Sequence, residues 1–189
     1  MNNPIVKLGL FLLLVTGISG LAVGYVNGIT APVIAGQDAE KLQQGYREVY
    51  PGADAFSELE YDAQGSQIAS VVLAQKNGET KGVIYTVVPK GYNGEIRILA
   101  GFDVAGKKIT GIKVLTQAET PGLGGNCAQV WFAERYAGKT ASRTLKIVKT
   151  ETVAEDEVQA ITAATITSNA VASGVNAAIA DFAARFGGR

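Results

Sequence analysis

The sequence contains no histidine and one cysteine, Cys127. Without histidine, the chain cannot form the Ser-His or Cys-His pairs of nucleophilic enzymes or a histidine-ligated metal site. A single cysteine allows neither an internal disulfide nor a CxxC redox pair. No carboxylates are spaced for acid–base catalysis, so we expect no catalytic side chains and no metal site. If this protein transfers electrons, a bound group must carry them.

The sequence also has no excess of either charge, because 17 lysines and arginines balance 17 aspartates and glutamates. Such a chain has no general electrostatic attraction to nucleic acid, so we expect no nucleic-acid partner. Its 189 residues suffice for one domain or two small ones. The hydrophobic fraction of 47% is high for that length, and much of the excess lies near the N-terminus.

A run of nineteen residues from Leu8 to Val26 carries no charge. A helix of about 20 residues crosses the roughly 30 Å hydrocarbon layer of a membrane, so this run is long enough to span it. Lys7 is the only basic residue before the run, and the positive-inside rule therefore predicts a cytoplasmic N-terminus. A cleaved signal peptide is the alternative, because the small residues around Ala22–Gly24 suit a signal peptidase.

We therefore expect two parts. Residues 1–30 are predicted to form a cytoplasmic N-terminus and a single-pass transmembrane helix in the cell (inner) membrane. Residues 31–189 are predicted to form an extracytoplasmic domain.

The extracytoplasmic part shows mainly strand patterns. Asn77-Gly78 lies between two strand-like runs, 67–75 and 81–88, and is the most explicit hairpin signal in the chain. Ala105-Gly106 separates a second pair, 95–103 and 108–115. The remaining expected elements are a strand at 144–149 and helices at 37–50, 126–137 and 168–186. The fold class is therefore predicted as α+β, with an antiparallel sheet and packed helices.

Two segments contain more glycine or threonine than their secondary structure requires. The first, Glu119–Gly125, reads ETPGLGG and precedes a predicted helix, where free N–H groups favour anions. It is alternatively a plain loop with Asn126 as the helix N-cap. The second, Ile161–Ser168, reads ITAATITS. Its hydroxyls either cap the last helix, through Thr167 or Ser168, or bind a phosphate, even covalently.

Together, ETPGLGG and, about forty residues later, ITAATITS resemble the FMN-binding domain shared by the G subunit of the Rnf complex and the C subunit of the sodium-pumping NADH:quinone oxidoreductase. The segment GYNGEI at 91–96 is similar to the GYxGxI of that family. The family writes its second motif [S/T]GAT, and its last threonine, Thr165 here, carries FMN through a phosphodiester bond. This sequence departs from the motif at Ala163, where the family usually has glycine.

The resemblance implies a membrane-anchored flavoprotein subunit of the Rnf complex, an ion-translocating ferredoxin:NAD⁺ oxidoreductase, which relays electrons through covalent FMN. It implies other subunits of that complex as partners, and a separate flavin transferase that donates FMN from FAD. The implied cofactor-binding residues are Thr165 (covalent FMN), Thr162, Ala163, Ala164, Glu119, Thr120, Gly122, Leu123 and Gly124.

Two alternatives remain open. The first alternative is that the chain is the FMN subunit of the Na⁺-translocating NADH:quinone oxidoreductase. The second is that it is a non-redox exported binding module whose threonines only cap a helix. For three aromatic residues the sequence favours packing: Tyr92 in the core rather than near the site, and Trp131 and Phe132 on a hydrophobic helix face rather than a docking surface.

Overall fold

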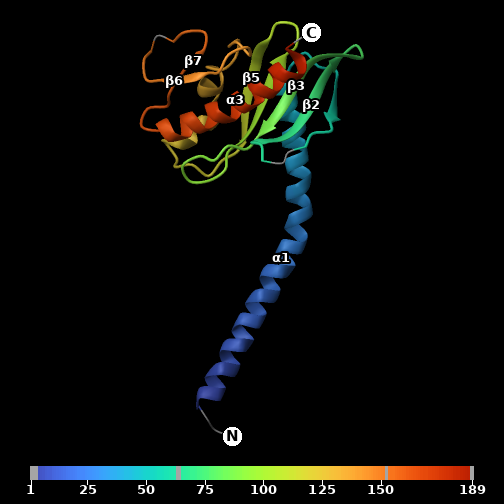
Figure 1. Ribbon diagram of the computed structural model, residues 1–189. Helices are drawn as coiled ribbons and strands as arrows, with labels where there is room; N and C mark the ends of the chain where they lie inside the picture. The colour runs from blue at the N-terminus through green and yellow to red at the C-terminus, as the bar shows by residue number, and fades with distance from the viewer. Residues whose placement is uncertain (1–3, 63–64, 152, 188–189) are drawn as a thin grey trace. The chain divides into compact units, whose positions relative to one another are not determined.

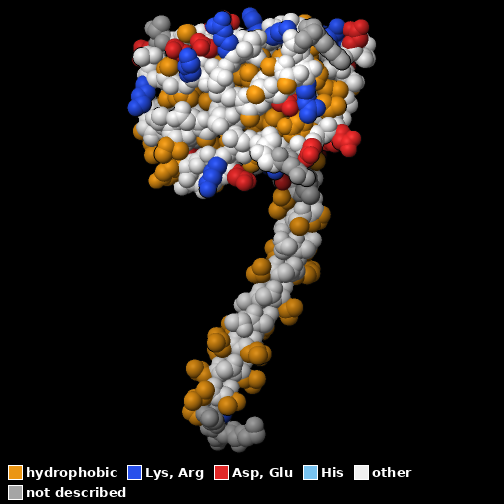
Figure 2. Space-filling model, in the orientation of Figure 1, with side chains coloured by type: hydrophobic (Ala, Val, Ile, Leu, Met, Phe, Trp, Pro, Cys, Tyr) orange, Lys and Arg blue, Asp and Glu red, His pale blue; other side chains and the backbone are white. Residues whose placement is uncertain are grey.

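The computed structural model describes residues 4–62, 65–151 and 153–187, and the chain divides into two compact units, Met1–Lys41 and Leu42–Arg189. Helix α1 (Pro4–Val49) supplies nearly all of the first unit. Its large apolar side chains from Ile5 to Ile34 are exposed, as Figure 2 shows in orange along the helix. Among the described residues, α1 alone is long and apolar enough to cross a membrane, with a mean hydropathy of 2.1 in its most apolar window.

The helix expected at 37–50 is the C-terminal part of α1, which is continuous through Pro32. Its last turn belongs to the second unit. There Tyr46 and Val49 are buried, as their helical spacing predicts, and Pro51 follows directly after the helix.

The second unit is built on a five-stranded antiparallel sheet in the simple order β1-β2-β3-β4-β5. Its strands are β1 (Ala55–Leu59), β2 (Ile68–Lys76), β3 (Glu79–Val87), β4 (Arg97–Asp103) and β5 (Lys108–Thr116). Both expected hairpins are confirmed. Asn77 and Gly78 each have a positive φ, 53° and 79°, which is the backbone that a tight two-residue hairpin requires. Strand β1 pairs with β2 at one edge and was not predicted.

The two faces of this sheet carry separate hydrophobic layers. Alternate residues of β4 divide between them: Ile98, Ala100 and Phe102 join the larger layer, and Leu99 joins the smaller. Helix α3 (Thr165–Phe186) covers the larger layer (Figure 1). The end of α1 packs on the smaller one through Tyr46 and other residues. The predicted α+β class is confirmed.

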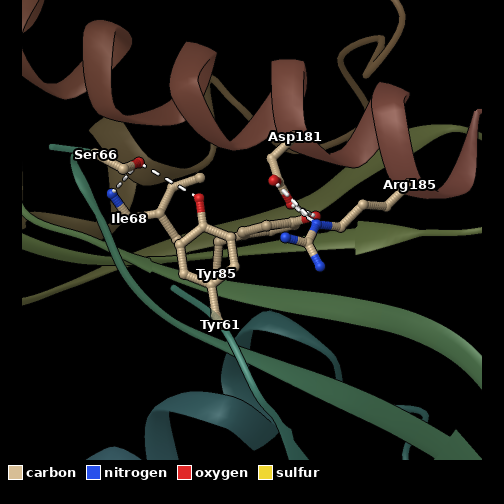
Figure 3. A network of polar contacts seen from close by, with 6 residues as sticks. All are labelled: Tyr61, Ser66, Ile68, Tyr85, Asp181 and Arg185. Atoms are coloured by element: carbon tan, nitrogen blue, oxygen red, sulfur yellow. Dashed lines mark hydrogen bonds and ion pairs between the residues drawn. The ribbon is translucent and has the colours of Figure 1, made fainter. Parts of the chain in front are cut away.

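A buried polar contact fixes α3 against the sheet. The hydroxyl of Tyr85 on β3, which is fully buried, donates a hydrogen bond of 2.9 Å to Asp181 on α3. Arg185 pairs with the same carboxylate and lies 5.0 Å from the ring of Tyr61 (Figure 3). Burial, and then the charge of Asp181, raise the pKa of Tyr85. This contact fixes the C-terminal part of α3 against β3.

The region between β5 and α3 differs in two respects from what the sequence predicts. The helix expected at 126–137 is divided into a 3₁₀ turn, η1 (Gly124–Ala128), and one α-helical turn, α2 (Val130–Ala133), because Gln129 between them is extended. The strand expected at 144–149 is β6 (Lys146–Val148), but it pairs in parallel with β7 (Glu157–Gln159) and forms a separate two-stranded sheet. Sequence analysis did not predict β7.

Candidate functional site

One pocket of about 540 Å³ brings together the three segments that the sequence singles out. One wall comes from the turn after β3, one from the loop after β5, and one from the start of α3. The lining residues are Tyr92, Glu119, Thr120, Leu123, Gly124, Ala163, Ala164, Thr165, Ile166 and Thr167.

Of the nine expected site residues, seven line this pocket, whereas Thr162 and Gly122 do not. Three further lining residues, Tyr92, Ile166 and Thr167, were not among the expected nine. The preferred core position for Tyr92 is wrong, because its side chain is 67% exposed at the pocket. Tyr92 follows Gly91 in the loop between β3 and β4, and such connecting loops run over the surface of a protein.

Glu119 links the three walls. Its side chain is only 5% exposed. One carboxylate oxygen accepts a hydrogen bond of 2.9 Å from the backbone N–H of Asn93, and the other accepts one of 2.5 Å from the hydroxyl of Thr167. These partners lie 26 residues before and 48 residues after Glu119 in the sequence. We call this set of contacts the Glu119 latch.

Two glycines leave room for the latch. A Cβ atom on Gly124 would lie 2.5 Å from the Thr167 hydroxyl oxygen and 2.6 Å from a Glu119 carboxylate oxygen. A Cβ atom on Gly91 would lie 2.6 Å from the other oxygen of the same carboxylate. Neither glycine has a positive φ, so close approach, rather than backbone freedom, requires glycine at both positions.

Helix α3 begins three residues earlier than expected, with Ala164 as its N-cap. Neither Thr167 nor Ser168 caps it, contrary to the capping alternative. The hydroxyl of Ser168 instead accepts the N–H of Ile161 and donates to the carbonyl of Ala164, both at 2.9 Å. The N-cap Ala164 therefore offers no side-chain acceptor to the first backbone N–H groups of the helix, which begins at the pocket wall.

The four hydroxyl groups of the ITAATITS segment have different environments. Thr167 and Ser168 are buried and hydrogen-bonded. Thr162 is exposed and lies outside the pocket lining. Thr165 is half-buried in the lining, and its hydroxyl has no hydrogen-bond partner among the described residues. Thr165 and Thr167 are thus the two threonines of this segment in the pocket lining, and of these only Thr165 has a hydroxyl with no hydrogen-bond partner among the described residues.

Ala163 has a φ of 61°, in the left-handed region that favours glycine. This is the position at which the sequence departs from the [S/T]GAT pattern. A left-handed backbone at this position explains why the pattern has glycine there, and in this chain alanine adopts the same backbone.

Arg135 joins the glycine-rich loop region to the segment before α3. Its guanidinium donates to the carbonyls of Gln159 at 2.7 Å and Ala160 at 3.1 Å, and lies 4.7 Å from the ring centre of Trp131. The two aromatic residues expected on one helix face have different positions, because Phe132 is fully buried whereas Trp131 is 43% exposed.

Cys127 is buried beside this site. Burial, and then the charge of Glu119, raise the pKa of its thiol to about 11, so the thiol stays protonated near neutral pH. The described residues include no group of three or more acidic or cysteine side chains arranged to hold a metal ion.

A family model described as "FMN-binding domain" matches residues 91–180, which contain the whole pocket. This chain is 35% identical to the G subunit of the Na⁺-translocating ferredoxin:NAD⁺ oxidoreductase complex of Acetobacterium woodii. The match covers 92% of this chain and 89% of that subunit. This chain is also 32% identical to the G subunit of the proton-translocating ferredoxin:NAD⁺ oxidoreductase complex of Clostridium ljungdahlii, and the match covers 91% of this chain and 88% of that subunit.

Among solved structures, the C subunit of the Na⁺-translocating NADH-quinone reductase from Parabacteroides distasonis superposes with a TM-score of 0.61, over 77% of this chain and 90% of its own. At 20% identity, this likeness concerns the fold alone. The identity to the two G subunits extends over almost the whole chain. The chain therefore belongs to the G-subunit family of ion-translocating ferredoxin:NAD⁺ oxidoreductase complexes.

Proposed function

We propose that this protein is the flavoprotein subunit of an ion-translocating ferredoxin:NAD⁺ oxidoreductase complex, and that it relays electrons through FMN joined to Thr165 by a phosphodiester bond. The observation that carries this proposal is the hydroxyl of Thr165, which has no hydrogen-bond partner among the described residues and lies at the wall of a pocket inside the matched FMN-binding region. The bound FMN would supply the redox chemistry that the side chains lack.

The pocket fits a flavin in size and in character. Its volume of about 540 Å³ is within the usual range for cofactor sites. Leu123, Ile166 and Tyr92 offer exposed apolar or aromatic surface to a planar ring. Thr120 adds a hydroxyl, and Gly124 has no side chain to fill the space. Mostly apolar walls with a few polar groups are the usual lining of a cofactor site.

The start of α3 favours a phosphate group at Thr165. The first N–H groups of a helix have no intrahelical acceptor, and the helix dipole makes that end favourable for an anion. The backbone there is held by Ser168, which bonds to both Ile161 and Ala164, and by the Thr167 contact to Glu119. These contacts occupy the neighbouring hydroxyls and leave Thr165 available for the bond to FMN.

The proposal extends to membrane topology and maturation. We propose that residues 1–30 provide a cytoplasmic N-terminus and a single-pass anchor, and that residues 31–189 form an extracytoplasmic FMN-binding domain. The apolar character of α1 and the position of Lys7 support this orientation. A separate flavin transferase would form the bond at Thr165, and the other subunits of the complex would be the electron-transfer partners.

The direct test compares the full chain produced with and without a flavin transferase, by intact mass and by in-gel flavin fluorescence after SDS denaturation. We expect one FMN phosphoester and fluorescence only with the transferase, and their complete loss in Thr165→Ala. The matched control is Thr144→Ala, which removes an exposed hydroxyl outside both the pocket lining and the ITAATITS segment and should keep the FMN. An unmodified wild-type chain beside a working control substrate would contradict the proposal.

The identity of the complex needs a second measurement. Co-purification from membranes with a ferredoxin-type iron–sulfur subunit supports the ferredoxin:NAD⁺ complex. Co-purification with a quinone-reactive subunit instead would assign the chain to the NADH:quinone complex.

A further inference from the structure

Glu119 is the only charged residue among those that line the pocket. Its carboxylate is buried, and the ion pairs found among the described residues do not include it. Both hydrogen bonds to its oxygens come from neutral donors, the Asn93 amide and the Thr167 hydroxyl. A buried carboxylate is usually paired with a cation or a metal, so this arrangement places an uncompensated negative charge at the pocket wall.

The latch holds that charge in place. One carboxylate oxygen contacts the Asn93 amide and the other contacts the Thr167 hydroxyl, so both ends of the group are fixed. The donors come from segments on opposite sides of Glu119 in the sequence, so the side chain cannot turn toward solvent without breaking both contacts. The charge also acts through the protein interior, because it contributes to the raised pKa of the Cys127 thiol.

We propose that the Glu119 carboxylate lowers the reduction potential of the flavin bound in this pocket, so that Glu119 tunes the carrier as well as shaping its site. The inference rests on the proposed function. Reduction adds negative charge to a flavin ring, and a fixed negative charge nearby therefore favours the oxidised form. The effect is strong here because the low dielectric of a buried site screens charges less than water does.

The test is a dye-equilibrated reductive titration, with dithionite as electron donor, of the flavin-loaded full chain in detergent. Glu119→Gln removes the charge but keeps the side-chain length, an acceptor for the Asn93 amide and a polar group for Thr167. We expect its oxidised-to-reduced equilibrium to shift at least tenfold toward the reduced form, which is about 30 mV upward for a two-electron couple. The matched control is Glu134→Gln, which removes one charge at an exposed position outside the pocket lining and should leave the potential unchanged.

The outcomes separate the two proposals. A wild-type chain that takes up no FMN contradicts the proposed function. Loaded wild-type and Glu119→Gln chains with equal potentials overturn the role of Glu119 and leave the proposed function standing. If Glu119→Gln retains no flavin, Glu119→Met decides, because it also removes the charge at a similar side-chain length. A shift of at least tenfold toward the reduced form in Glu119→Met supports the inference, and an equilibrium equal to that of the wild type overturns it.

Discussion

Replacing Ala163 by glycine should stabilise the second unit, because Ala163 is held at a φ of 61°. In that region the Cβ atom of an L-residue is crowded by its own backbone. The side chain of Ala163 is exposed, so its removal loses little packing. Glycine should therefore relieve strain at the residue that precedes the N-cap of α3 without disturbing the core.

The size of the effect follows from two opposing contributions. The left-handed backbone costs an alanine about 1–2 kcal/mol. Glycine has more freedom in the unfolded chain, which takes back about 0.4–1 kcal/mol. The midpoints of these two ranges leave a net gain of about 0.8 kcal/mol, or an increase in Tm of about 2–3 °C for a unit of roughly 150 residues.

Thermal unfolding of the full chain in detergent, followed by the fluorescence of Trp131, measures this change, because Trp131 is the single tryptophan and lies in the second unit. The control is Ala164→Gly. Ala164 has a negative φ of −131° and is buried, so glycine there relieves no strain and removes a buried methyl group. Its Tm should fall. A Tm for Ala163→Gly at or below the wild-type value would refute the reasoning.

Two further perturbations test other parts of the second unit. Thr167→Val leaves one oxygen of the buried Glu119 carboxylate without its donor. This variant should lower the free energy of unfolding, measured in urea, by about 1–3 kcal/mol. The control Thr162→Val, at an exposed site, should change the free energy of unfolding by less than about 0.5 kcal/mol. Equal effects of these two variants would contradict the latch. The pKa of Tyr50 is raised from 10 to about 12 by burial and then by Asp103, so its contribution to stability is complete below pH 10 and is lost as the pH rises toward 12. The difference in Tm between wild type and Tyr50→Phe should therefore narrow across that interval, and a constant difference would argue against a buried, neutral Tyr50.

The sequence predicted the elements whose signals are local. Asn77-Gly78 marks the β2–β3 turn because few other residue pairs adopt two positive φ angles easily. The apolar spacing along α3 predicts its buried face, which includes Val171, Val175, Ile179 and Phe182. Both motifs also predicted residues that the fold brings to one pocket, since seven of the nine expected residues line it.

The contacts that complete the site depend on tertiary structure. Serine and threonine before a helix are usual N-caps, but Thr167 contacts Glu119 and Ser168 contacts Ile161 instead. These partners lie next to Thr167 and Ser168 only in the folded structure, and are distant or non-capping positions in the sequence. The start of α3 was misplaced by three residues for that reason. Pairing of β6 with β7 likewise depends on a partner that their short, partly polar strands do not specify.

The contact of Arg135 with the two carbonyls before α3 restricts the spacing of the chain. Arg135 reaches Gln159 and Ala160 from a segment that begins at the pocket with Gly124. An insertion or deletion between Gly124 and Arg135 would draw the guanidinium away from both carbonyls or displace the residues that lead to Thr165. In homologous subunits that keep this arginine contact, the number of residues between these two positions should therefore vary less than the length of the exposed turns in the sheet.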